Sequence, residues 1–577
     1  MQGTDQMTKI ALAVAATFAT LTAAGTARAL DLTPIGTVKT GPFISEDPRA
    51  AEINAFDPEG RRIFVVNPQG SRLDVIDASN PADPKVDAAV PFIDIVAACE
   101  AALGASCPVL PGSEPNSVAI HGQLMAVAAG NAVRTDNGHA VFFELRGSAA
   151  PRFHGVVEVG ALPDMITFTA DGRYALTANE GEPNRDYTID PVGSVSVIEV
   201  AQLGTRRAVR HVGFERFDNP GQRAKLDREG VRIFGPGASV AQDLEPEYIA
   251  TVGNKAYVTL QENNALAIIN IAGATVEKVA GLGLKDHSLA GNALEASDQV
   301  AGTPTRIQNW PVHGMYQPDT VHAVTLQGRT YLITANEGDA REYPGTPGFV
   351  EAVRLNNNGS NAPFNRYDLD PGVFPNAAEL EINSNLGRLT VSTASGDLDG
   401  DGDFDRIDVF GARSVSILDQ QGALVWDSGE MFERIAEAND LLLNPASATP
   451  TLFNTTNSAN SRRNRSDDKG VEPESVTVGE VNGRSYAFVG LERDGGIVVL
   501  DVSEPTAPEY VTYRNNRKFP RNAAGTGFLN CAAAGVDCGD LGPEGLTFVP
   551  AAESPTAKAL LIVSNEVSST TTIWEIE

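Results

Sequence analysis

Short apolar runs rich in β-branched and aromatic side chains recur along the chain, separated by turns of Gly, Asn and Asp. Examples are YALTANE (174–180), TYLITANE (330–337) and YAFVGLE (486–492). Runs of this length and composition indicate strands, because an amphipathic helix needs apolar residues three or four positions apart over a longer stretch. Residues 430–443 form the best helix candidate, and the chain offers few others. The pattern predicts an all-β protein.

The runs belong to a repeated unit. The unit begins with Pro and an acid at the start of a first strand, reaches Asn-Glu or a similar corner at the end of a second strand, and continues into a third apolar strand. Five copies are clear, and the two that begin Ala51-Glu52 and Pro115-Asn116 are weaker. Seven copies begin at Ala51, Pro115, Pro163, Pro246, Pro318, Pro473 and Pro543. Seven such units predict a seven-bladed β-propeller, in which each blade buries its faces against its neighbours. A set of separate β domains is the alternative.

The last copy ends after its third strand. Residues 32–40 resemble the fourth-strand segment 151–160 in their alternation of apolar and polar positions. We therefore expect the N-terminal strand to complete the last blade, which would close the ring without an exposed edge.

The copies are unevenly spaced, and the longest gap separates Asp319 from Glu474. We assign residues 338–412 to an insertion in blade five and residues 430–470 to a second loop. Residues 30–577 then form one domain, in place of the three or four that a domain size of about 150 residues suggests.

The first 29 residues have the order of a secretory signal peptide. Lys9 precedes an apolar run over 10–24, and small residues follow up to Ala27 and Ala29. We expect cleavage after Ala29; an N-terminal membrane anchor is the alternative. With no further hydrophobic segment after cleavage, we expect a soluble monomer, either periplasmic or extracellular.

The four cysteines fall as two close pairs, Cys99 with Cys107 and Cys531 with Cys538. No second C-x-x-C accompanies them to build a zinc site. In an exported protein we expect two local disulfides, each closing a short surface loop.

The 577 residues include 74 acidic and 44 basic side chains, giving a net charge of −30. This charge argues against a nucleic-acid partner. The sequence also lacks H-E-x-x-H, G-x-S-x-G, a P-loop and a dinucleotide fingerprint, so it points to no familiar catalytic class.

Many of the acidic residues lie at repeated positions. In a meander, the start of strand one and the end of strand two share one edge of the blade, so we expect the first acid and the corner Glu of five copies to converge on one face, the acidic mouth. Its carboxylates are Asp164, Glu180, Glu247, Glu262, Asp319, Glu337, Glu474, Glu492, Glu544 and Glu566. Such density requires cations, basic partners or raised pKa values. Alternatively, these acids only cap strands and shape turns.

Blades three and five add a second acid two residues after the corner, Glu182 and Asp339. Arg341 follows closely in blade five. These residues, with the corner acids Glu180 and Glu337, are the best catalytic candidates in the chain.

Residues 397–408 (DLDGDGDFDRID) fit the calcium-loop pattern D-x-[DN]-x-[DN]-G-x5-acid, with Asp408 in place of the usual Glu. We expect Ca²⁺ as the cofactor; a merely solvated acidic turn is the alternative. The predicted ligands are Asp397, Asp399, Asp401, Asp403 and Asp408.

Four segments carry a family resemblance: LPDMITFTADGRYALTANEGEPN (162–184), ITANEGDARE (333–342), GDLDGDGDFDRIDVFGARSVSI (396–417) and GPEGLTF (542–548). They resemble the choice-of-anchor I family, also labelled mesenchyme-specific cell-surface glycoprotein-like. The resemblance implies an exported propeller, often joined to a variable C-terminal anchor; we recognise no such anchor here. Some relatives are labelled alkaline phosphatases, and a calcium-loaded acidic mouth is similar to that of propeller phytases.

Two functions follow from these observations. The first is a calcium-stabilised binding or adhesion module that engages a surface ligand. The second is a calcium-dependent phosphoesterase acting on a small phosphate ester. It would use Glu180, Glu182, Glu337 and Asp339 as ligands or base, and Arg341 to steady the phosphate. No Ser or Thr is identified as a nucleophile, which favours the first.

Overall fold

The computed structural model describes residues 30–43, 50–205, 207–300, 305–356, 367–440, 452–457, 462–524, 528–531, 533 and 535–577. The predicted signal peptide, residues 1–29, lies outside this part of the chain. No helix in the described part is long and apolar enough to cross a membrane.

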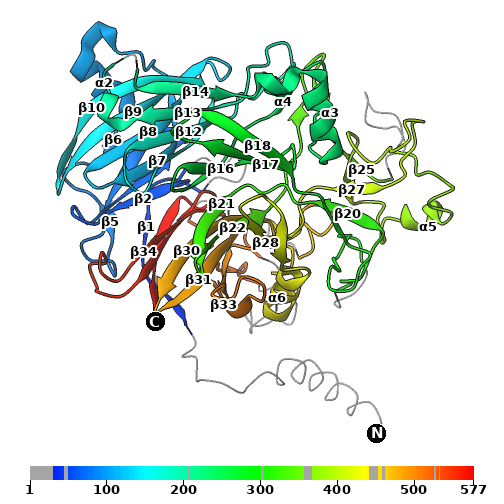
Figure 1. Cartoon of the computed structure of the whole chain (residues 1–577). Coiled ribbons are helices and arrows are strands. Elements are labelled where there is room, and N and C mark those ends of the chain that lie inside the picture. The colour runs from blue at the N-terminus through cyan, green and yellow to red at the C-terminus, as the bar shows by residue number, and fades with distance from the viewer. Residues whose placement is uncertain are drawn as a thin grey trace. The chain divides into compact units, whose positions relative to one another are not determined.

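Seven antiparallel sheets, numbered here 1 to 7, follow one another along the described residues (Figure 1). Strands that are consecutive in the chain pair with each other, as expected for meanders. Sheet 1 comprises β2 (Asn54–Asp57), β3 (Arg62–Asn67), β4 (Arg72–Asp77), β5 (Lys85–Val86) and β6 (Phe92–Ile93). Sheet 2 comprises β7 (Glu114–His121), β8 (Leu124–Gly130), β9 (Asn137–Arg146) and β10 (Ala149–Ala161). Sheet 3 comprises β11 (Pro163–Phe168), β12 (Tyr174–Asn179), β13 (Ser194–Glu199) and β14 (Val209–Gly213).

The other four sheets have four strands each. Sheet 4 comprises β15 (Ile249–Val252), β16 (Lys255–Leu260), β17 (Ala265–Asn270) and β18 (Thr275–Gly281), and sheet 5 comprises β21 (Val321–Leu326), β22 (Arg329–Asn336), β28 (Ser414–Asp419) and β29 (Leu424–Asp427). Sheet 6 comprises β30 (Pro473–Val481), β31 (Arg484–Leu491), β32 (Gly496–Asp501) and β33 (Glu509–Asn515). Sheet 7 comprises β34 (Pro543–Val549), β35 (Leu560–Asn565), β36 (Thr570–Ile576) and β1 (Leu32–Lys39).

The first strands of the seven sheets contact one another in a cycle: β2, β7, β11, β15, β21, β30, β34 and back to β2. The core lies between consecutive sheets. One apolar cluster joins Met165 of sheet 3 to Val258 of sheet 4, and another joins Ile333 of sheet 5 to Val489 of sheet 6. Sheets that pack face to face in this way form a β-propeller.

The N-terminal strand closes the last sheet, as predicted. Strand β1 pairs antiparallel with β36, with Leu32 opposite Ile576 and Lys39 opposite Thr570. The outer edge of β36 is therefore covered by a strand from the other end of the chain.

The segment between β22 and β28 contains β23 (Glu342–Tyr343), β24 (Phe349–Val350), β25 (Ala352–Arg354), α5 (Ala377–Leu380), β26 (Thr390–Ser392) and β27 (Ile407–Val409). Strand β27 runs parallel to β20 (Val312–Met315), which also pairs with β19 (Leu284–Asp286). Residues 338–412 therefore share a small sheet and an apolar cluster with the segment before sheet 5. The sequence showed no sign of this partner, because residues 284–315 carry no repeat pattern.

Helices are few, as the strand pattern predicts. Besides α5, the described residues form α2 (Ile95–Leu103), α3 (Pro220–Arg228), α4 (Val240–Asp243) and α6 (Met431–Asn439), with short 3₁₀ turns η1 (Pro68–Gly70), η2 (Gly104–Ser106), η3 (Val200–Gln202) and η4 (Glu215–Asp218). Helix α6 confirms the helix candidate, so the predicted loop 430–470 begins with a helix. The two disulfides, Cys99–Cys107 and Cys531–Cys538, are confirmed.

The Asn of the Asn-Glu corner is a structural residue. The Asn179 side chain is fully buried, and its Nδ2 donates to the hydroxyls of Ser194 (3.2 Å) and Ser196 (2.9 Å), while its Oδ1 accepts from Thr177 (2.8 Å). Asn336 repeats the same three contacts in sheet 5. These bonds join strands two and three at the point where the corner Glu leaves the sheet.

Asn179→Ala should lower the free energy of unfolding by about 1–3 kcal/mol, because buried hydroxyls lose their partner. The denaturation midpoint measured by circular dichroism tests this. Asn464→Ala is the matched control, since Asn464 is exposed, and it should stay within about 0.5 kcal/mol. Equal effects of the two substitutions would contradict a structural role for the corner Asn.

Candidate functional site

Backbone pairing places each corner Glu beside the start of the first strand of its sheet. The amide of Glu180 donates to the carbonyl of Leu162 (2.9 Å), two residues before Asp164, and the amide of Glu566 donates to the carbonyl of Gly542 (2.8 Å). The predicted shared edge of first acid and corner Glu is therefore present in these sheets.

The carboxylates of the acidic mouth are close enough to perturb one another. Burial, followed by repulsion from Glu544, Glu337 and Asp164, raises the pKa of Asp319 well above its ordinary value. Glu544 and Asp164 belong to other sheets than Asp319. Burial likewise raises the pKa of Glu262 to about 7 and that of Glu492 to about 8. The mouth therefore holds more negative charge than its surroundings stabilise.

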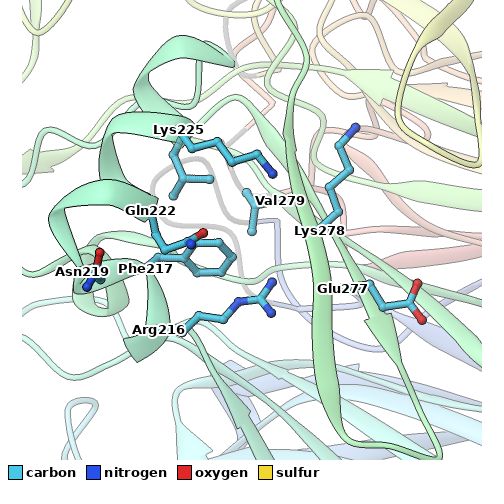
Figure 2. Close-up of a pocket in the computed structure, with 9 residues that line it drawn as sticks. Arg216, Phe217, Asn219, Gln222, Lys225, Glu277, Lys278 and Val279 are labelled. Atoms are coloured by element: carbon cyan, nitrogen blue, oxygen red, sulfur yellow. The ribbon is translucent and has the colours of Figure 1, made fainter.

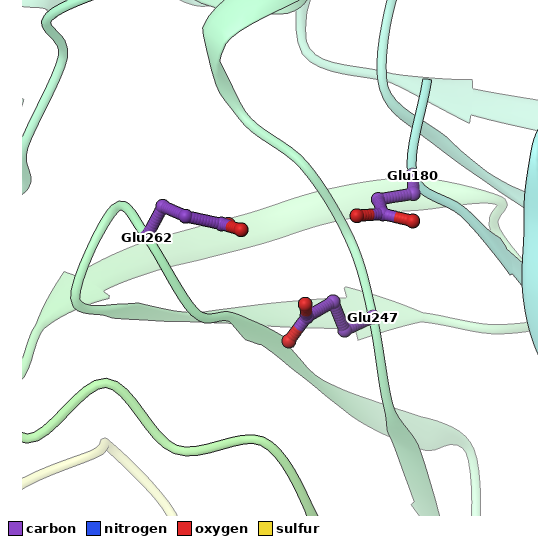
Figure 3. Close-up of side chains that lie close together, drawn as sticks. All are labelled: Glu180, Glu247 and Glu262. Atoms are coloured by element: carbon purple, nitrogen blue, oxygen red, sulfur yellow. The ribbon is translucent and has the colours of Figure 1, made fainter. Parts of the chain in front are cut away.

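Two groups of three carboxylates stand out. We call Glu180, Glu247 and Glu262 the open triad and Glu337, Glu472 and Glu492 the paired triad; within each, one oxygen per residue lies within 4.8 Å of the others. Figure 3 shows the carboxylates of the open triad turned toward a common space.

Basic side chains surround the paired triad. Lys469 forms an ion pair with Glu337 and lies 3.3 Å from Glu472. Arg465 reaches Glu472 at 2.6 Å, and Arg493 lies 3.0 Å from Glu472 and 2.9 Å from Glu492. Three cations thus face three carboxylates.

The open triad has no such partners. Among the described residues, no Lys or Arg forms an ion pair with Glu180, Glu247 or Glu262, and one carboxylate oxygen each of Glu247 and Glu262 is buried without a hydrogen-bond partner. The nearby cations are engaged elsewhere: Arg134 pairs with Glu182, and Arg341 pairs with other acids.

The structure corrects the role expected for Arg341. Its side chain is fully buried and lies 3.0 Å from Asp243 and 2.9 Å from Glu245. It cannot reach a phosphate arriving from solvent, because its donors face these two acids inside the protein.

The other catalytic candidates also lie in different charge environments. Glu180 belongs to the open triad and Glu337 to the paired triad. Glu182 pairs with Arg134 and accepts from the Tyr343 hydroxyl at 3.3 Å, while the Asp339 side chain is exposed. The ion pairs and hydrogen bonds of these residues therefore involve different partners.

Sequence reasoning missed Glu245 and Glu472. Each precedes the Pro of a repeat, so the motif E-P-E occurs at 245–247 and at 472–474. The doubled acid was a visible signal, but its cations were not. Arg341 reaches Glu245 from a distant segment, and Lys469, three residues before Glu472, lies outside the repeat pattern.

The predicted calcium loop gathers Asp397, Asp399 and Asp405, with one oxygen of each within 4.8 Å of the others. The negative charge of Asp401 raises the pKa of Asp399.

The other predicted ligands lie differently. Asp401 accepts from the backbone amide of Asp403 at 3.2 Å. Asp408 is fully buried and is held by Arg406 through two bonds of 2.6 and 2.8 Å. Asp405, and not Asp408, therefore lies with Asp397 and Asp399, since the guanidinium of Arg406 holds the carboxylate of Asp408.

Cavities lie both away from the acidic mouth and at its border. The one in Figure 2, about 490 Å³, is lined by the basic residues Arg216, Lys225 and Lys278 around Phe217 and includes no mouth carboxylate. A second cavity of about 400 Å³ borders the paired triad and is lined by Asp339, Arg465, Lys469 and Arg493 among others.

Comparison with known proteins identifies relatives. A family model described as the choice-of-anchor I domain matches residues 52–505. Gigasin-3a of Magallana gigas is 29% identical over 204 residues, 34% of this chain and 66% of that protein. The mesenchyme-specific cell surface glycoprotein of Strongylocentrotus purpuratus is 27% identical over 329 residues, 51% of this chain and 40% of that protein. The chain thus matches less than two thirds of either relative's length.

Solved structures also align with the chain. The WD40 domain of Toxoplasma gondii coronin has a TM-score of 0.44 at 8% identity and covers 96% of this chain and 87% of its own. Hydrazine synthase of Kuenenia stuttgartiensis has a TM-score of 0.41 at 11% identity and covers 93% and 98%. Neither likeness bears on function.

The raised pKa values predict an unusual pH dependence. Burial raises the pKa of Glu544 from 4.5 to about 7, so between these values the folded protein binds more protons than the unfolded chain. The free energy of unfolding of the chelator-treated protein should therefore fall as the pH rises from 5 to 8. Thermal midpoints across this range measure the effect.

Glu544→Gln should flatten this slope, whereas Glu553→Gln, at an exposed position, should leave it unchanged. A stability that rises with pH over the same window would contradict the perturbed mouth.

Proposed function

The chain belongs to the choice-of-anchor I family, and from this premise we propose that it is an exported, calcium-binding, seven-bladed β-propeller that acts as a ligand-binding or adhesion-type module at the cell surface. The cycle of seven sheets closed by β1 supports the blade count. The cell-surface name of the sea urchin relative supports the location.

The observation that carries the proposal is the accumulation of carboxylates without enough internal cations, at the mouth and in the loop of Asp397, Asp399 and Asp405. Oxygen-only ligand sets suit calcium, which accepts six to eight oxygens at about 2.3–2.6 Å. A calcium-loaded acidic face would bind a surface ligand through charged and hydrated contacts.

The phosphoesterase remains a weaker candidate. Arg341 is buried and paired, the other candidates belong to separate charge groups, and no nucleophile is identified among the described residues. No contact in this part of the chain favours it over binding.

Calcium should stabilise the protein through the loop. At a free calcium concentration of 100 times Kd, one site adds about 2.7 kcal/mol to the free energy of unfolding. The double variant with Asp397→Asn and Asp399→Asn should lose most of the rise in Tm that calcium binding to the loop produces. Asp136→Asn, at an exposed position outside any acidic group, is the control. An unchanged shift in the double variant would refute the loop as a calcium site.

Export is tested in the cells that produce the protein. The mature chain should begin near residue 30, and its polypeptide should be cut by protease added to intact cells if it lies at the surface. A protein that keeps residues 1–29 and stays inside the cytoplasm would overturn the proposal. Calcium-dependent hydrolysis of p-nitrophenyl phosphate by the purified protein would instead favour the phosphoesterase.

A further inference from the structure

The open and paired triads occupy equivalent places in the repeat. Glu180 and Glu262 are the corner acids of sheets 3 and 4, and Glu337 and Glu492 are those of sheets 5 and 6. In each triad, two neighbouring sheets therefore supply their corner carboxylates.

The third carboxylate comes in both cases from an E-P-E motif. Glu247 follows the Pro in sheet 4, whereas Glu472 precedes the Pro in sheet 6. The remaining acid of the first motif, Glu245, is neutralised by Arg341 at 2.9 Å. The fold thus builds the same kind of carboxylate group twice, with different residues in the third place.

The two triads differ in what balances their charge. The ammonium group of Lys469 lies among the acids of the paired triad, where it contacts Glu337 and Glu472 and donates to the carbonyl of Gly338 at 2.6 Å. Arg465 and Arg493 complete the balance. A buried cation at this position stabilises carboxylates that burial would otherwise disfavour.

In the open triad the corresponding space contains no basic side chain of the described residues. Glu262 is only 5% exposed, and one of its carboxylate oxygens has no hydrogen-bond partner. Glu247, whose carboxylate lies beside those of Glu180 and Glu262 (Figure 3), also has an oxygen without a partner. A buried, unpaired carboxylate is costly, so these oxygens require a partner that the polypeptide does not supply.

We infer that the open triad binds one divalent cation of the calcium class, in the place that Lys469 fills in the paired triad. The inference rests on the proposed function and adds a second, buried ion to it. The ligand set consists of oxygens only, which suits hard cations. Ligands on opposite sides of a Ca²⁺ ion lie about 4.8 Å apart, at twice a Ca–O distance of about 2.4 Å. The three oxygens lie within 4.8 Å of one another, so one such ion can contact all three.

The test counts ions in protein that lacks the loop site. In the background Asp397→Asn with Asp399→Asn, equilibrium dialysis against calcium at pH 7.5 should give one bound ion per chain. Adding Glu262→Gln should abolish this binding. Adding Glu553→Gln should preserve it, since Glu553 is exposed and lies outside the acidic mouth and both triads.

The results that would contradict a cation site at the open triad differ from those that would contradict a calcium site in the 397–408 loop. No ion bound in the loop-deficient background would overturn the open triad as a site. Binding that survives Glu262→Gln, or equal loss in Glu262→Gln and Glu553→Gln, would overturn it as well. The loop remains tested by its own shift in Tm, so the two claims fail separately.

A further variant tests the equivalence of the triads. Lys469→Gln in the loop-deficient background removes the ammonium group from the paired triad and should add a second bound ion. An unchanged count of one would contradict the equivalence.

A second measurement covers the case in which Glu262→Gln does not fold. Tyr343 interacts electrostatically with Glu180 and Glu262, so its ring should sensitise terbium bound in the open triad. Tyr343→Phe keeps every carboxylate and should reduce terbium emission excited through tyrosine in the loop-deficient protein. Emission unchanged by this substitution would place the ion elsewhere.

Discussion

Repulsion among carboxylates at one face is the constraint on which the other features of this molecule depend. The meander places the first acid of a sheet beside its corner Glu, and the cycle of first strands brings these pairs from several sheets together. Apolar packing between the sheets supplies the stability. The acids therefore cannot move apart without loss of the core, and their charge must be balanced where it stands.

The balance comes mainly from segments outside the strands. Lys469 and Arg465 precede sheet 6, Arg341 lies in the insertion after β22, and Arg134 lies between β8 and β9. The insertion and loops thus complete the charge pattern that the repeats begin. The open triad has no basic side chain of the described residues to pair with. Our proposal is that a bound cation balances its negative charge.

The features that could be predicted from the sequence are those that depend on the alternation of apolar and polar residues and on the repeated unit. Strand positions, the closing N-terminal strand and the two disulfides are confirmed, because alternation, repeat phase and close cysteine spacing each encode a local contact. The shared edge of first acids and corners also follows from meander geometry. Contacts between distant segments were not accessible: the pairing of β20 with β27 and the capture of Glu245 by Arg341 leave no periodic trace. The contact of Arg406 with the carboxylate of Asp408 was also not foreseen, although it is local.

Anomalous scattering from a crystal of the full mature chain soaked in calcium would test the central claim most directly. Our account predicts a peak between the carboxylates of Glu180, Glu247 and Glu262 and none between those of Glu337, Glu472 and Glu492, where Lys469 already lies. A crystal that shows calcium in the 397–408 loop but none at the open triad would contradict it.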